Sequence, residues 1–256
     1  MPRRTSFLAA ALIAAASLAL LSDRDHPRLV AATAAATMGE AAARADGTTN
    51  ELALATSAAA DVDADALTGR AAVHALLASE GASTYLGDIL TQRDSVLTRW
   101  PVDDERPVTV WIQPLGREGH ALPHAAQVQR AFVEWEATGV PVRFVFVSEA
   151  RQADVQVRWI DHFSEPISGK TMWAHDDDGW IREGRITLAL QHSDGEPLDS
   201  AAVRALALHE VGHVLGLDHT SDSGNVMAPR VRVRSLSATD MATAHLLYRL
   251  PPGDVR

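Results

Sequence analysis

The sequence predicts an α/β (α+β) fold, in which strands and helices build one sandwich. Short runs of apolar and β-branched residues predict strands at 108–112, 142–147, 155–160, 171–174 and 186–190. Two longer segments, 125–138 and 200–217, have apolar residues three and four positions apart, which predicts helices. Because one helix follows the first strand and the other follows the last, the pattern indicates a mixed α/β sandwich.

The first 22 residues are typical of an export signal. Arg3 and Arg4 precede an apolar run from Phe7 to about Leu21, which is long enough for a signal-peptide core and short for a membrane span. No clean small-x-small triplet closes the run, so an uncleaved membrane anchor is the alternative. We expect a protein that is secreted, periplasmic or anchored in the cell envelope, with a membrane as partner only if this segment is uncleaved.

Residues 23–95 form a separate segment before the domain at 96–256. Between Asp23 and Gly69 the composition is rich in Ala, Thr, Asp and Gly, and few large apolar residues are present. Such a stretch cannot bury enough surface to offset its ordering entropy, which favours a stalk. An inhibitory pro-segment is the alternative. Residues 70–97 have helical spacing and predict one or two helices, which could pack on the following domain.

Residues with special backbone chemistry mark the ends of the predicted elements. Pro107 and Pro114 bound the strand at 108–112, and Gly139 ends the helix that begins near residue 125. Asp199 or Ser200 is suited to cap the helix at 200–217.

Composition excludes several classes of site. The chain has 256 residues and a formal net charge of -10, which argues against a nucleic-acid partner. It has no cysteine, so disulfides and thiolate metal ligands are excluded. Any bound metal must be held by histidine or carboxylate.

The second predicted helix carries a metal-binding pattern. His209 and His213 are four residues apart, so both side chains lie on one helix face, with Glu210 beside them. Gly216 is suited to end the helix in a left-handed turn that returns the chain to His219. Three protein ligands with an open fourth position are typical of catalytic zinc. A pair of histidines alone is often just a polar helix face, but the added glycine and third histidine favour the metal site.

This extended pattern resembles the metzincin zinc peptidases. Metzincins follow the third histidine with a methionine-containing turn, and Met227 lies eight residues after His219, in the segment 225–229. A lone methionine is more often ordinary core, but its place before Ala-Pro favours the Met-turn. The distance and the Met-x-Pro ending are similar to the matrixin branch, the matrix metalloproteinases. Residues 235–248 are similar to the matrixin C-terminal helix, and the whole resemblance spans about 105–250.

The resemblance implies a twisted five-stranded mixed sheet, mostly parallel, with a zinc-binding active-site helix, a Met-turn and a C-terminal helix. It implies a zinc endopeptidase in which His209, His213 and His219 bind one catalytic Zn²⁺. Glu210 would act as the general base on a zinc-activated water, and a protein or peptide would be the substrate. The absence of cysteine excludes the cysteine switch of many matrixins. The alternatives are a catalytically silent, envelope-anchored binding module and a peptidase of another metzincin branch.

The resemblance also implies candidate substrate-binding residues. Met172, Trp173 and Ala174 correspond to the matrixin edge strand on which an extended peptide binds, although a core strand is the alternative. Arg230 and Arg232 lie in the segment that walls the S1' pocket in matrixins. One alternative is that they form a solvated arginine face. The other is that one arginine faces the pocket and favours acidic or polar P1' residues in the substrate.

Further metal sites are weaker candidates. The region that holds a second zinc and calcium in matrixins here contains His162, His175 and His192, together with the calcium-loop fragment 176–179. Carboxylates beside a glycine are commonly solvated turns, so Ca²⁺ is only a possible cofactor. His120, His124 and His245 show no ligand spacing and are expected at the surface or in helices.

Overall fold

The computed structural model describes residues 69–103, 105–115 and 121–255. The predicted export signal (1–22), the predicted stalk up to residue 68 and His120 lie outside the described residues. The residues from Val73 onward belong to one compact unit. No helix among the described residues is long and apolar enough to cross a membrane.

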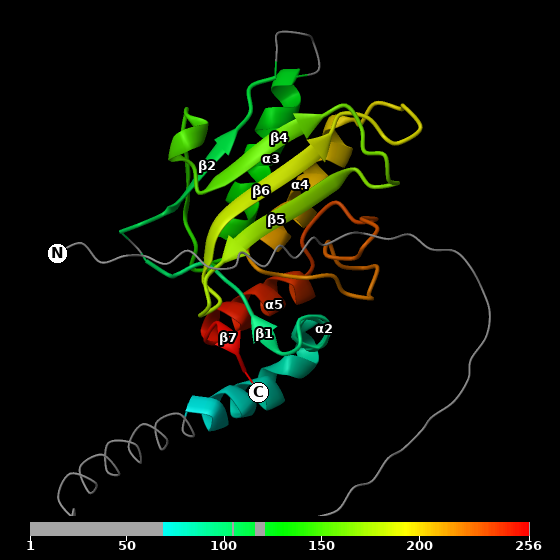
Figure 1. Cartoon of the computed structure of the whole chain (residues 1–256). Coiled ribbons are helices and arrows are strands. Elements are labelled where there is room, and N and C mark those ends of the chain that lie inside the picture. The colour runs from blue at the N-terminus through cyan, green and yellow to red at the C-terminus, as the bar shows by residue number, and fades with distance from the viewer. Residues whose placement is uncertain (1–68, 104, 116–120, 256) are drawn as a thin grey trace, which may run out of the picture. The chain divides into compact units, whose positions relative to one another are not determined.

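A five-stranded mixed sheet forms one layer of this unit (Figure 1). Its order is β3-β2-β4-β6-β5, and the strands are β2 (Val108–Ile112), β3 (Phe144–Phe146), β4 (Val155–Ile160), β5 (Gly169–His175) and β6 (Ile181–Ala189). Neighbouring strands pair in parallel except β5, which is antiparallel to β6 at the edge. The predicted five-stranded mixed sheet, mostly parallel, is confirmed.

The largest departure from the predicted strands concerns β6, which begins at Ile181 and not at 186. Its first half is a polar stretch, Arg182–Arg185, that has no strand-like apolar alternation. This half is nevertheless in the sheet because it pairs with β5, where Trp173 lies opposite Gly184. A Cβ at position 184 would lie 3.3 Å from Val155 on β4, so glycine permits close packing there. Long-range pairing therefore overrides the local pattern.

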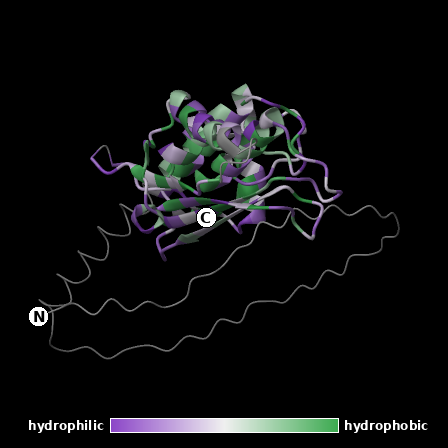
Figure 2. Ribbon diagram, turned by 90° about the horizontal axis from the view of Figure 1, so that it is seen from above, coloured by the Kyte–Doolittle hydropathy of each residue, from purple (hydrophilic) through white to green (hydrophobic). Residues whose placement is uncertain are grey.

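Two helices cover one face of the sheet, as Figures 1 and 2 show. They are α3 (Ala121–Ala137) and α4 (Ser200–Val214), and they pack on each other while α4 also contacts β5 and β6. The structure begins α3 four residues before the predicted start, with Pro123 in its first turn, where a proline is tolerated. The Asp199 side chain caps α4 by accepting a hydrogen bond of 2.7 Å from the Ala202 N–H.

The C-terminal helix α5 (Ala238–Arg249) begins with a capping box. Ser237 accepts from the Asp240 N–H, and the Asp240 carboxylate accepts from the Ser237 N–H. The resemblance placed this helix correctly, between 235 and 248.

From Val73, the chain before the sheet also packs into the unit. Residues 69–80 are helical, and they are followed by the short 3₁₀ helix η1 (Gly81–Ser83) and by α2 (Leu86–Gln92). Leu86 and Ile89 on α2 are fully buried. Next, β1 (Val96–Leu97) pairs with β7 (Gly253–Asp254) near the C-terminus. The predicted helices are confirmed, while the division of the chain at residue 96 stays a prediction.

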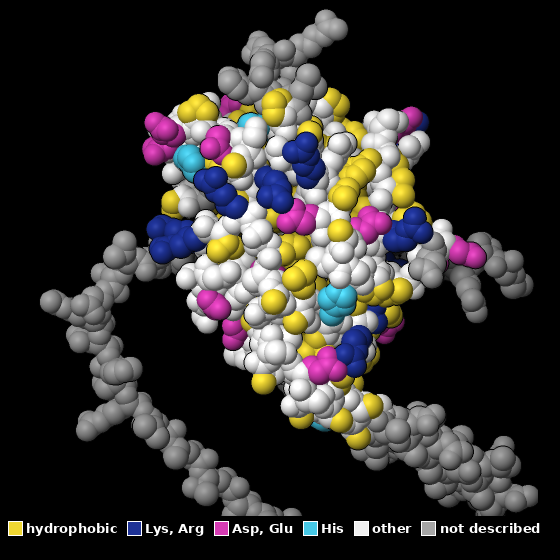
Figure 3. Space-filling model, turned by 180° about the vertical axis from the view of Figure 1, so that it is seen from behind, with side chains coloured by type: hydrophobic (Ala, Val, Ile, Leu, Met, Phe, Trp, Pro, Cys, Tyr) yellow, Lys and Arg dark blue, Asp and Glu magenta, His cyan; other side chains and the backbone are white. Residues whose placement is uncertain are grey.

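Apolar side chains fill the space between the layers, and Figure 2 shows hydrophobic segments concentrated there. Acidic and basic side chains are interspersed on the face drawn in Figure 3. Three aromatic side chains from this core also donate hydrogen bonds to the backbone of α4 and its C-cap. Trp135 Nε1 donates to the Leu208 carbonyl and Trp100 Nε1 to the Val214 carbonyl, both at 2.8 Å, and Tyr248 Oη donates to the Leu215 carbonyl at 3.0 Å. Carbonyls in the last turn of a helix have no partner within the helix, so the bonds to Val214 and Leu215 fix the place where α4 ends.

Candidate metal centre

Helix α4 places three polar side chains in the core. His209, Glu210 and His213 are only 3–4% exposed. Their neighbours on the helix are apolar, so α4 is buried on nearly every side. Burying polar side chains costs free energy unless each finds a partner, and the partners of these three define the site.

The chain turns back sharply after α4. Gly216 has a φ of +101°, which glycine adopts readily. The Gly216 N–H donates to the His213 carbonyl and the Leu217 N–H donates to the Gly212 carbonyl, both at 3.0 Å, which is the bonding pattern of a Schellman motif. This turn directs His219 back toward α4, as the sequence predicts.

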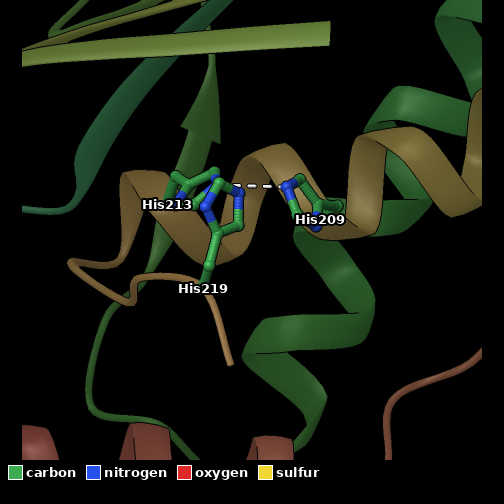
Figure 4. Close-up of side chains that lie close together, drawn as sticks. All are labelled: His209, His213 and His219. Carbon is green, nitrogen blue, oxygen red and sulfur yellow. Dashed lines mark hydrogen bonds between the residues drawn. The ribbon is translucent and has the colours of Figure 1, made fainter. Parts of the chain in front are cut away.

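The three predicted histidines converge (Figure 4). His213 Nε2 lies 3.1 Å from His209 Nε2 and 3.2 Å from His219 Nε2. In the part of the chain that the structure describes, these histidines form the one group of at least three His, Cys, Asp or Glu side chains that could hold a metal ion. A set of three imidazole nitrogens fits zinc and leaves one coordination position open.

Backbone carbonyls orient two of the rings. His209 Nδ1 lies 2.7 Å from the Val226 carbonyl and His213 Nδ1 lies 3.0 Å from the Leu217 carbonyl. A proton on each Nδ1 satisfies the carbonyl and leaves the Nε2 lone pair facing the common centre. Burial lowers the pKa of His209 to about 4 and lowers that of His213 well below its ordinary value. The rings are therefore neutral near pH 7, as metal binding requires.

Glu210 is held against the edge strand. Thr171 Oγ1 on β5 donates to Glu210 Oε2 at 2.6 Å and lies 3.1 Å from the Glu210 carbonyl. A Cβ at position 169 would lie 2.3 Å from Glu210 Oε1, so any side chain there would displace this carboxylate. Burial raises the pKa of Glu210 to about 7, although the bond from Thr171 acts in the opposite direction. The sequence shows no pattern that points to Thr171 or Gly169 as partners of this carboxylate.

Met227 is fully buried and lies against α4. A Cβ at position 212 would lie 2.3 Å from Met227 Sδ, so the thioether packs directly on the helix at Gly212, the residue before His213. The Thr220 N–H donates to the Met227 carbonyl at 3.1 Å, which closes the loop that follows His219. Met227 therefore packs on the helix that carries His209 and His213, and its role as the Met-turn stays a prediction.

The predicted substrate strand is at the edge of the sheet. Met172 and Ala174 on β5 are half-buried, whereas Thr171 and Trp173 are buried on the side that faces α4. The Arg93 guanidinium covers one face of the Trp173 ring, at 4.8 Å from the ring centroid. Of the three candidate residues, Met172 and Ala174 thus have the more accessible side chains.

The arginines after the Met-turn are exposed. Arg230, Arg232 and Arg234 point outward, and Val231 and Val233 alternate with them as partly buried residues packed on the core. This arrangement matches a solvated arginine face. It leaves the predicted role of Arg230 and Arg232 in a specificity pocket as a prediction.

The candidates for further metal sites are not brought together. His162, His175 and His192 form no metal-binding group in the described part of the chain. The Asp176 carboxylate accepts from the Trp180 N–H and from the Arg182 guanidinium, so it is engaged within its own turn. His245 Nε2 lies 2.9 Å from the Thr138 carbonyl, and His124 packs in the core near Trp159.

Comparison with known proteins agrees with this geometry. The model of the matrixin family matches residues 104–249. Metalloendoproteinase 4-MMP of Arabidopsis thaliana is 29% identical over 136 residues, which are 48% of this chain and 40% of that protein. Metalloendoproteinase 1 of Glycine max is 31% identical over 98 residues, or 36% of this chain and 30% of that protein. The matches thus cover well under half of the length of these relatives.

Proposed function

The chain belongs to the matrixin family, and from that membership we propose that it is an exported zinc-dependent endopeptidase. Its substrates would be proteins or peptides. The observation that carries the proposal is the convergence of His209, His213 and His219 beside a buried carboxylate, Glu210. The relatives are named metalloendoproteinases, which supports the same activity.

His209, His213 and His219 would hold one Zn²⁺ through their Nε2 atoms. Bound zinc supplies a Lewis acid that lowers the pKa of a water from 15.7 to about 7. Glu210 follows His209 directly and is held by Thr171, so its carboxylate lies beside the ligands without joining them. Glu210 would accept a proton from water and later donate it to the leaving amine.

The substrate would bind in an extended form along β5. This strand is last in the sheet and pairs with β6 on one side, so a peptide can add to its other side by backbone hydrogen bonding. Met172, Trp173 and Ala174 would contribute mainly backbone groups, since Trp173 packs inward. Arg230 and Arg232 would favour acidic or polar P1' residues, and profiling with a peptide library tests this. A preference for large apolar P1' residues would contradict it.

Cleavage of casein or gelatin tests the activity. We expect zinc bound at one ion per chain, cleavage that a chelator abolishes, and recovery on adding Zn²⁺. Glu210→Gln keeps the shape of the side chain and removes the base, so kcat should fall by about 10²–10⁴-fold. The matched control is Glu196→Gln, which changes an exposed glutamate and should keep full activity. A protein that binds zinc but cleaves neither substrate would be the silent binding module.

Export and calcium belong to the same proposal. Intact-mass measurement and N-terminal sequencing of the secreted form would show whether residues 1–22 are removed and how much of residues 23–95 remains. Calcium at the 176–179 turn stays a prediction, which calorimetric titration of the zinc-loaded protein with Ca²⁺ tests.

A further inference from the structure

The third predicted zinc ligand, His219, lies on a loop outside α4. We propose that Arg93 is the positioning residue that holds this loop, and that α2, which Arg93 follows, therefore remains part of the active enzyme. The proposal rests on the proposed zinc peptidase function. On this proposal, proteolytic processing can remove the segment before α2, whereas the metal centre needs α2 itself.

Arg93 is one of the most thoroughly engaged side chains in the described unit. Its guanidinium donates to Asp218 Oδ2 at 2.9 Å, to Thr98 Oγ1 at 2.7 Å, and to the carbonyls of Gly216 at 3.0 Å and Leu217 at 3.2 Å. Its side chain is only 7% exposed. Three of these four acceptors belong to residues 216–218, which directly precede His219. A planar guanidinium can make such bonds together, and an ammonium cannot.

Asp218 connects Arg93 to the ligand residue His219. Its Oδ1 accepts from the His219 N–H at 2.8 Å, while its Oδ2 accepts from Arg93. One carboxylate thus joins the guanidinium to the backbone of the ligand residue. The Asp218 side chain is 14% exposed, so the ion pair is largely shielded from water, where charge-assisted bonds are strong.

Helix α2 holds the loop at two further points. Gln92 Nε2 donates to the His219 carbonyl at 2.8 Å, and Thr220 Oγ1 donates to Asp88 Oδ2 at 3.2 Å. Together with Arg93, these contacts place residues from α2 and its C-cap against both sides of His219 in the chain. Arg93 also stacks on Trp173 of β5, so one side chain contacts both the ligand loop and the proposed substrate strand.

Without α2 and Arg93, His219 would be held mainly by the Gly216 turn before it and by the bond from the Thr220 N–H to the Met227 carbonyl after it. His209 and His213 lie on a rigid helix, and backbone carbonyls orient their rings. Removing a residue that hydrogen-bonds to a metal ligand and so orients it typically weakens metal affinity by 10–100-fold. We therefore expect loss of Arg93 to weaken zinc binding while the protein stays folded.

The test compares Arg93→Met with Arg99→Met in the full chain. Arg99 is a matched control because it also stacks on aromatic rings, Trp180 and Tyr248, and donates to two backbone carbonyls, but it contacts no residue of the ligand loop. Competition with a chromogenic chelator gives the zinc dissociation constant. We expect Arg93→Met to raise that constant by about 10–100-fold, and Arg99→Met to change it less than threefold. Equal constants for the two variants would overturn the proposal.

Methionine at position 93 leaves Asp218 without its counter-charge, so this variant could unfold. Arg93→Lys then decides, because lysine keeps the charge but cannot make all four bonds. Zinc binding at least threefold weaker than in Arg99→Met supports the proposal, and equal binding contradicts it. The visible absorption of the Co²⁺-substituted protein should shift with Arg93→Lys and not with Arg99→Met.

The N-terminus of the active form tests the second half of the proposal. N-terminal sequencing of the secreted, zinc-loaded protein should give a chain that begins before Leu86, and an active form that begins within or after α2 would contradict the role of α2. Zinc affinity does not depend on peptidase activity. If the wild type cleaves nothing but Arg93→Met still weakens zinc binding, the proposed function fails and this inference stands. If the wild type is active and both arginine variants bind zinc alike, only this inference fails.

Discussion

Glu210 is a carboxylate buried in the core of the unit, and its protonation is coupled to stability. Burial raises its folded-state pKa from 4.5 to about 7. Between these values the folded protein holds a proton that the unfolded chain has released. The stability that depends on this proton is fully present below pH 4.5 and is lost as the pH rises through 7. Above pH 7 the metal-free protein therefore contains a destabilising buried charge.

Replacing Glu210 with glutamine removes this charge. We predict that metal-free Glu210→Gln is more stable than the metal-free wild type at pH 8, by up to about 3 kcal/mol, and that the difference disappears near pH 4. Urea unfolding at the two pH values in the presence of a chelator measures it. Glu196→Gln, at an exposed position, should show no such pH-dependent gain. If the two variants behaved alike at pH 8, Glu210 would not be the buried acid described here.

The sequence identifies the residues that react but not those that support them. The histidines and Glu210 lie within eleven positions, so their spacing on one helix and one turn predicts the site directly. Thr171 is 39 positions from Glu210, and Arg93 is 125 positions from Asp218. Such pairs meet only through tertiary packing, and a threonine in a strand or an arginine after a helix has no local pattern that reveals its partner.

At the scale of elements, the turn after α4 decides where the third histidine lies. Gly216 has a φ of +101°, and a Cβ there would lie 2.1 Å from the Thr98 carbonyl oxygen. Gly195 has a similar φ of +87° but has nothing within 4 Å of a Cβ position. Comparing a substitution at Gly195 with one at Gly216 therefore distinguishes the cost of backbone strain from the cost of a steric clash.

We predict that Gly216→Ala is the more damaging substitution. Alanine at positive φ costs roughly 1 kcal/mol at either position, and at 216 it must also displace the chain segment that holds Thr98. Gly195→Ala should lose about that amount of stability and keep its zinc affinity. Gly216→Ala should lose more stability and bind zinc at least tenfold more weakly. Thermal unfolding and chelator competition give both quantities, and equal losses would contradict the close approach at 216.

The predicted elements were most accurate where local pattern and tertiary contact agree. The strands at 108–112 and 155–160 have the predicted bounds, because buried apolar residues alternate along both. The strands at 171–174 and 186–190 were predicted too short. Arg182–Arg185 is polar and belongs to β6 through its pairing with β5 and, at Gly184 and Arg185, with β4. The helix at 200–217 was predicted too long, since Leu215 and Leu217 are as apolar as the helix itself although Gly216 already reverses the chain.

At the scale of the whole unit, Asp240 connects segments that are distant in sequence. It is fully buried, and its carboxylate accepts from the Val226 N–H, the Ser237 N–H and Tyr85 Oη. The residue next to Met227, the start of α5 and the start of α2 are therefore joined at one side chain. Val226 in turn accepts from His209 Nδ1, so this network reaches the metal centre. The metal centre and the core around it should respond together when zinc is removed.

Zinc removal should therefore lower the stability of the whole unit. Zinc at 100 times its dissociation constant contributes about 2.7 kcal/mol, provided that it binds only the folded state. For a domain of this size each kcal/mol shifts the melting temperature by roughly 2–4 °C, so a chelator should lower it by roughly 5–10 °C. His219→Ala should melt at a temperature that the chelator leaves unchanged. His162→Ala replaces an exposed histidine outside the cluster and should keep the full shift. A shift that His162→Ala abolished would place the stabilising metal elsewhere, and the three histidines would then not be the site that joins α4, its following loop and α5 into one cooperative unit.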